Sequence, residues 1–138
     1  MANDLKSLQR RLEAIPLAVR EAVMPALAKS GNELADTMRQ LAEPSRDTGD
    51  LIASIAVTTA GNTTPPYSQP GGSKVVPANA IMVTAGNTDV RYPHLVEYGT
   101  TKAPAQPFFW PAYRLLKRRM SNRIKRSISK AVREGWKQ

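Results

Sequence analysis

The sequence predicts an α+β fold, with N-terminal helices, a small antiparallel sheet carrying a long Pro/Gly-rich loop, and a long basic C-terminal helix. Three observations support this prediction. Apolar residues recur at helical spacing in the first third of the chain and again in its last quarter. Between them lie two short β-branched segments, separated by a stretch with many prolines and glycines. The length of 138 residues suits one domain, so we assign residues 1–138 to a single unit.

The first third is expected to form more than one helix. An apolar stripe recurs at spacings of three and four residues through Leu5, Leu8, Leu12 and Ile15. Pro16 lacks a backbone donor, so it is expected to end this helix or to open the next one as its first residue. A second stripe runs from Val19 to Leu41, before Pro44, and Pro25 within it predicts a kink or a second break.

The middle of the chain predicts a short helix followed by two strands. Asp47 and Thr48 are good N-cap residues, and Asp50 would favour the first turn of a helix over residues 51–55. The strands are expected from about residue 55 to 59 and at residues 80–85, each ending near a Gly-Asn pair. The connecting segment, residues 62–79, has no periodicity and is expected to be a flexible loop. A loop of this length is commonly either functional or disordered, and the sequence leaves both readings open.

The last third predicts a turn, an extended segment and the final helix. Gly99 is a natural position for a positive φ. Pro104 and Pro107 keep the approach extended, because proline disfavours helix in the residue before it. Pro111 is tolerated only in a first turn, so we place the helix at residues 108–134. Such a helix is about 40 Å long, so part of it is expected to project beyond its own core and to rest on another molecule.

The net charge of +9 lies entirely at the C-terminal end. Residues 1–112 hold ten Lys/Arg and ten Asp/Glu, whereas residues 113–138 hold ten Lys/Arg and only Glu134. A neutral body with a basic helix suggests an anionic partner, although a solvated face and a protein-docking face are equally open readings. The candidate partner- or DNA-facing residues are Arg114, Lys117, Arg118, Arg123, Lys125, Arg126, Lys130 and Arg133.

A nucleic-acid-binding module is therefore the main alternative function. A dense row of cations can neutralise phosphates and bind without reading bases. Phe108, Trp110 and Tyr113 could stack on bases, but their place at the start of an amphipathic helix favours burial in the core.

Two segments resemble a known family. The string His94–Thr100, followed by Pro104–Phe108 and Pro111–Tyr113, resembles the signature of the phage head–tail joining family, the neck and tail-completion proteins of long-tailed phages and gene-transfer particles. Upstream, Asp47–Leu51 with Ser54–Ile55 resembles the second motif of that family. The motif residues are Asp47, Thr48, Gly49, Leu51, Glu97, Tyr98, Gly99, Thr100, Pro104, Gln106, Pro107, Phe108 and Pro111.

The resemblance implies a non-enzymatic virion protein, assembled in the host cytoplasm. It would be a subunit of the head–tail junction or of a tail-terminator (tail-completion) ring, often a hexamer in such tails. Its partners would be other copies of itself, the tail tube protein and the head–tail connector or stopper protein, with genomic DNA passing through the lumen. We expect the 62–79 loop and the basic helix to carry contacts between subunits or with the tail tube.

Enzymatic, metal-binding and membrane functions are weakly supported by the residues. There is no cysteine, and His94 is the single histidine, so we expect no metal site and no cofactor. Asp47-Thr48-Gly49 matches the triplet of aspartic proteases, but Glu43–Arg46 before it is not an apolar strand, and helix capping is favoured. No apolar run is long enough for a signal peptide or a membrane span, so neither is expected.

Overall fold

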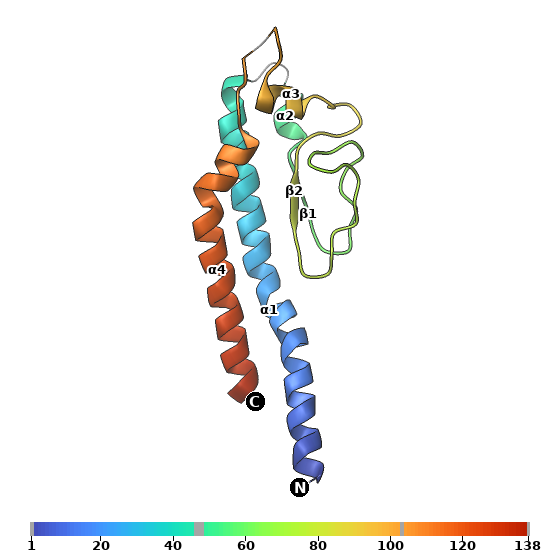
Figure 1. The fold of residues 1–138 in the computed structure, drawn as a ribbon, viewed down its shortest axis with the longest axis vertical. Coiled ribbons are helices and arrows are strands. Elements are labelled where there is room, and N and C mark those ends of the chain that lie inside the picture. Colours follow the sequence, from blue (N-terminus) through green and yellow to red (C-terminus); the bar gives the residue numbers. More distant parts are fainter. Residues whose placement is uncertain (1, 46–48, 103, 138) are drawn as a thin grey trace.

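Two long antiparallel helices and a small sheet form the molecule. The computed structural model describes residues 2–45, 49–102 and 104–137. Helix α1 (Ala2–Ala42) and helix α4 (Phe109–Lys137) run side by side, and the strands β1 (Ala56–Thr58) and β2 (Met82–Thr84) lie next to α1 on the side away from α4 (Figure 1). Short elements complete the chain: the 3₁₀ helix η1 (Glu43–Ser45), helix α2 (Asp50–Ala53) and helix α3 (Pro93–Tyr98). The predicted α+β class is confirmed.

Helix α1 is continuous, so the break predicted at Pro16 is wrong, and so is the second break at Pro25; the kink, the other possibility at Pro25, stays a prediction. A proline inside a helix costs about 3 kcal/mol, mainly because it removes one hydrogen bond, but its fixed φ is itself helical. Packing against α4 begins near Val23, which is buried, and can offset that cost at Pro25. The Ser127 hydroxyl of α4 also donates to the carbonyl of Ala22, close to Pro25, at 3.1 Å.

The short helix α2 begins as expected, but with a different cap. Gly49 occupies the N-cap position with a φ of +88° and, as a glycine, has no side chain with which to cap the helix. The two predicted caps, Asp47 and Thr48, lie outside the described residues. Asp50 lies in the first turn, where its charge suits the positive end of the helix.

The strands are shorter than predicted, because part of the predicted second strand pairs elsewhere. β1 and β2 are antiparallel, with Val57 opposite Val83. Ala85 pairs instead with Gln69 of the loop, through two backbone hydrogen bonds of 2.8 and 3.0 Å. The loop is further closed by the Thr64 hydroxyl, which is buried, accepts from the Lys74 amide at 2.7 Å and donates to the Gly72 carbonyl. Residues 62–79 therefore fold back against the sheet.

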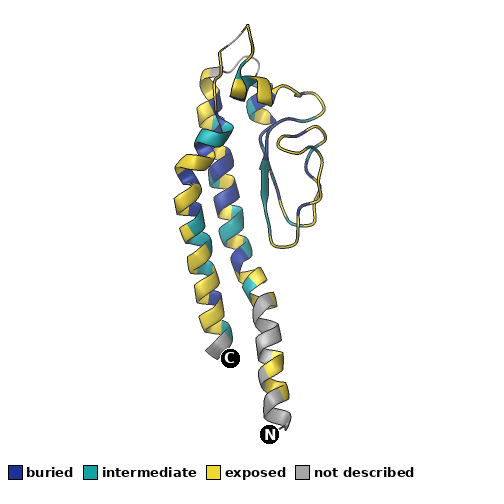
Figure 2. Cartoon of the chain, viewed as in Figure 1, coloured by how far each residue is buried: buried dark blue, intermediate teal, exposed yellow. Residues whose placement is uncertain are grey.

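The core lies where α1, α2, the sheet and the start of α4 meet (Figure 2). Its members are Leu34, Ala35, Met38, Ala42, Leu51, Ile55, Ala85, Val90, Phe108, Ala112, Leu116 and Met120. Gly31 of α1 lies where side chains from the sheet region pack closely on the helix. A Cβ atom there would lie 3.0 Å from Ile81 Cδ1 and 3.2 Å from Val57 Cγ1, so a side chain would push the sheet away.

Candidate assembly surfaces

The family-like segment around Glu97 forms a structural junction between α3 and α4, which we call the α3–α4 junction (residues 93–110). Glu97 is only 6% exposed, and its carboxylate accepts three backbone hydrogen bonds from the start of α4. Phe108 and Phe109 donate to Oε2 at 2.7 and 2.9 Å, and Trp110 donates to Oε1 at 3.1 Å. These amides have no partners within α4, so Glu97 satisfies them and places a negative charge at the positive end of the helix.

The rest of the α3–α4 junction holds this cap in place. Pro93 is the first residue of α3, a position that proline favours. This start signal is present in the sequence, but a helix of six residues is too short to show apolar periodicity. Gly99 ends α3 with φ +77° and ψ 175°, a combination that is essentially restricted to glycine. The Gln106 amide then donates to the Val96 carbonyl at 2.8 Å, which fixes the extended segment against α3.

The remaining motif residues of this segment differ in burial. Pro104, Gln106 and Pro107 are exposed, whereas Phe108 is buried at 1% exposure and Pro111 lies in the first turn of α4. The Thr100 hydroxyl accepts from the Lys102 amide at 3.2 Å. The structure therefore brings Glu97, Gly99 and Phe108 together as one packing unit, with the prolines on its outer side.

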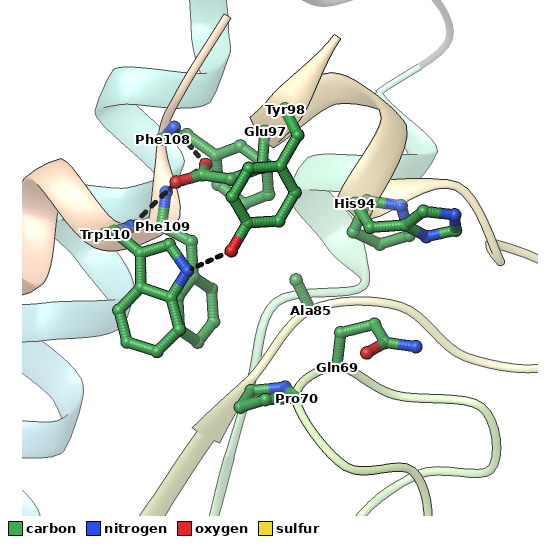
Figure 3. Close-up of a pocket in the computed structure, with 10 residues that line it drawn as sticks. Gln69, Pro70, Ala85, His94, Glu97, Tyr98, Phe108, Phe109 and Trp110 are labelled. Atoms are coloured by element: carbon green, nitrogen blue, oxygen red, sulfur yellow. Dashed lines mark hydrogen bonds between the residues drawn. The ribbon is translucent and has the colours of Figure 1, made fainter. Parts of the chain in front are cut away.

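A small cavity beside the α3–α4 junction offers little room for chemistry (Figure 3). Its volume is about 70 Å³, which corresponds to roughly two water molecules, and its walls include Gln69, Pro70 and Trp110. Trp110 Nε1 donates to the Tyr98 hydroxyl at 2.8 Å across its mouth. The Glu97 carboxylate points into the first turn of α4 and away from His94 (Figure 3). Glu97 is thus occupied as a cap rather than free to act as a base.

The second family-like segment supports the core. Leu51 and Ile55 are both buried in the core cluster. The Ser54 hydroxyl donates to the Leu51 carbonyl at 2.6 Å and accepts from the Gly86 amide at 3.0 Å. This bond joins α2 to the segment that follows β2. Asp47 and Thr48 lie outside the described residues, so the structure does not test the comparison of Asp47-Thr48-Gly49 with the aspartic-protease triplet.

An open groove runs between α4 and β2, with α1 as its floor. Its volume is about 650 Å³, and apolar side chains dominate its surface. The lining residues are Leu27, Ser30, Gly31, Leu34, Met38, Pro70, Ile81, Met82, Val83, Phe109, Trp110, Tyr113, Lys117, Met120, Ser121, Ile124 and Lys125. The amphipathic pattern predicts that the aromatic residues at the start of α4 lie in the core, and the structure confirms this only for Phe108. Phe108 is buried there, but Trp110 is half-buried and Tyr113, 37% exposed, lines the groove.

The basic residues of α4 divide into two groups. Arg123 is directed at α1: it donates to the Ser30 hydroxyl at 3.0 Å and forms an ion pair of 3.2 Å with Glu33. It is therefore poorly placed to face a partner, although the sequence put it among the partner-facing residues. Arg119 also reaches Glu33, at 3.5 Å, although its side chain is exposed. The other exposed cations are Arg114, Lys117, Arg118, Lys125, Arg126, Lys130 and Arg133, which we call the basic face.

Among the described residues, no three His, Asp or Glu side chains converge as a metal ion would require. The helices described are also not apolar over a length that could cross a bilayer.

Comparison with known proteins identifies the family to which the chain belongs. The model of the HK97-gp10-like family, described as "Bacteriophage HK97-gp10, putative tail-component", matches residues 6–99, or 94 of the 138 residues. The match includes Glu97 and Gly99 and ends before the segment that carries Pro104, Pro107 and α4. No curated protein and no solved structure matches the chain. The chain belongs to the HK97-gp10-like family of phage tail components.

Proposed function

We propose that this tail component is a subunit of the head–tail junction or of the tail-completion ring, where copies of it close around the end of the tail. Family membership makes it a virion protein with a structural role in the tail. The finer role is our proposal, as are its partners: further copies, the tail tube protein and a connector or stopper protein. A structural role also leads us to propose that the protein is not an enzyme.

The open groove is the observation that carries this proposal. Soluble monomers rarely leave a large contiguous apolar surface uncovered, and such surfaces commonly mark protein contacts. The groove combines the hydrophobic side chains of α1, β2 and α4 with a rim that includes Lys117 and Lys125. An apolar centre with a polar rim is the usual anatomy of a protein–protein interface. A neighbouring subunit seated there would cover it.

The unequal lengths of the two long helices support the same proposal. Helix α1 has 41 residues and α4 has 29, and the N-terminal end of α1 extends beyond the end of α4 (Figure 1). A helix gains most of its stability from tertiary packing, so a helix that extends beyond its partner favours a contact supplied from outside the chain.

We also propose that residues 1–138 form a single domain. The core cluster combines residues of α1, α2 and α4, which come from both ends of the chain. Neither end could therefore keep this core alone.

The test is sedimentation velocity of the protein, alone and with purified tail tubes. We expect a discrete ring, or a monomer that assembles on tube ends. Ile124→Glu, in the groove, should abolish assembly while the far-ultraviolet circular dichroism stays unchanged. Ile128→Glu is the matched control, because Ile128 lies one turn along the same helix, is 38% exposed and does not line the groove. A monomer that ignores tail tubes at every concentration would contradict the proposal.

A further inference from the structure

The basic face of α4 carries a high density of exposed positive charge. Its seven exposed cations extend from Arg114 to Arg133, a length of about 29 Å at 1.5 Å per residue. Helix α4 packs on α1 through its other side, with Ala112, Leu116 and Met120 buried (Figure 2). The seven cations are therefore exposed and take no part in the packing of the helix pair.

Intramolecular carboxylates leave most of this charge unneutralised. Lys130 approaches Glu134 at 4.0 Å, but both side chains are more than half exposed, so the pair contributes little. Glu33 of α1 is shared between Arg119 and Arg123, which are not part of the basic face. Among the described residues, no carboxylate lies within ion-pairing distance of the other six cations of the basic face.

A second copy of the chain is also a poor counterpart. Residues 1–112 hold equal numbers of acidic and basic residues, so the body of a neighbouring subunit has no net charge to offer. Protein interfaces are also depleted of lysine and of charge at their centres, whereas nucleic-acid interfaces are much more positive. The basic face therefore fits a regular polyanion better than a protein surface.

We infer that the basic face of α4 binds the phosphate backbone of double-stranded nucleic acid without reading its sequence. Duplex DNA presents one charge per ~1.7 Å of its axis, so a face of this length can meet several phosphates. Cations of this kind position a protein on a duplex, and base contacts are not needed. The inference depends on the placement of charge alone, and it stands whether or not the protein forms a ring.

The first test measures binding of fluorescent duplexes of two unrelated sequences by anisotropy over a salt series. If four phosphates are contacted, the dissociation constant should rise about 100-fold between about 50 and about 200 mM salt. The two sequences should bind equally. A clear preference for one sequence, or affinity independent of salt, would overturn the inference.

Two variants with equal loss of charge locate the binding surface. The first replaces Arg114, Arg118, Arg126 and Arg133, none of which lines the groove, with glutamine, and the control replaces Arg20, Lys29, Lys74 and Lys102, which are exposed elsewhere. The first should bind at least about 100-fold more weakly at low salt and lose most of the salt dependence, whereas the control should keep its slope. Equal weakening in both would mean that net charge, and not the basic face, attracts the duplex.

Competition with poly-L-glutamate at equal charge concentration tests the protein-like alternative. We expect the basic face to prefer the regularly spaced phosphates of the duplex to the carboxylates of the polypeptide, so the duplex should remain bound. Displacement of the duplex by the polypeptide, also lost in the first variant, would show that the face prefers an acidic protein surface. Sedimentation of the same samples reports ring assembly separately, so failure of the duplex binding does not decide the proposed function.

Discussion

The α3–α4 junction buries its charged group and bonds it within the chain, whereas the distal part of α4 leaves most of its charged groups exposed. In the junction, Glu97 is almost completely buried and each of its hydrogen bonds ends within the chain. Along distal α4, most charged side chains point into solvent, and Arg123 is the exception. A charge that is satisfied internally serves the fold, whereas a row of charges left outside is available to another molecule.

Residues that hold the fold can therefore be distinguished from residues that are available to a partner. Glu97 and Gly99 lie inside the segment matched by the family model, and both position the helix that follows. The basic residues lie outside that segment. Substitutions in the junction should therefore change stability first and assembly as a consequence, and substitutions on the basic face should change binding with little effect on stability.

The largest effect is expected for Glu97→Ala. The variant leaves three amides at the start of α4 without their acceptor, and the Phe108 amide is buried. A lost acceptor costs ~1–3 kcal/mol for a buried donor, so we expect a total loss of about 3 kcal/mol. For a chain of this size the melting temperature should fall by roughly 10 °C. Differential scanning calorimetry measures it.

Glu33→Ala is the matched control for that prediction. Glu33 is also an acidic residue bonded to α4, but its side chain is 26% exposed and its partners are side chains near the surface. Its loss should cost no more than ~1 kcal/mol. Equal losses for the two variants would remove the distinction between the buried junction and the surface of α4.

Gly99→Val should have the next largest effect. The φ of +77° with an extended ψ is accessible essentially to glycine alone, and forcing another residue into it costs ~1–3 kcal/mol. We expect lower thermal stability and poor particle assembly. The control is Thr101→Val, an exposed position two residues further on. If chemical denaturation gives Gly99→Val the midpoint of the control, the turn is not constrained as described.

Gly31→Val tests the contact between α1 and the sheet. The new side chain would meet Ile81 and Val57 and should cost about 1–2 kcal/mol through overpacking. Shortening the neighbour relieves part of the clash, so the pair Gly31→Val with Ile81→Ala should be more stable than the sum of the single losses by about 1 kcal/mol. A double-mutant cycle in urea measures this coupling, and strict additivity would contradict it.

The sequence predicted the order of elements because each depends on short-range signals. Helical periodicity identified α4, and the prolines at 107 and 111 placed its start within one residue of Phe109. The break at Pro16 is wrong, as is a break at Pro25, where packing against α4 can outweigh the local signal; the sequence also missed α3, which is too short to show a period. The groove could not be predicted, since it forms between residues far apart in the chain, such as Leu27, Val83 and Ile124.

The smallest changes in stability are expected for single substitutions of cations on α4, and they should differ between the packed Arg123 and the exposed Lys125. Arg123→Gln removes the bonds to Ser30 and Glu33 from a side chain that is only 16% exposed, so we expect a loss of about 1 kcal/mol. Lys125→Gln removes an exposed charge and should change stability by less than ~0.5 kcal/mol. Urea denaturation should show Arg123→Gln to be the less stable variant, whereas duplex affinity should be lower for Lys125→Gln. Two variants that lose stability and affinity in parallel would mean that α4 has no division between a packing side and a binding side. The charge of this helix would then serve the fold alone.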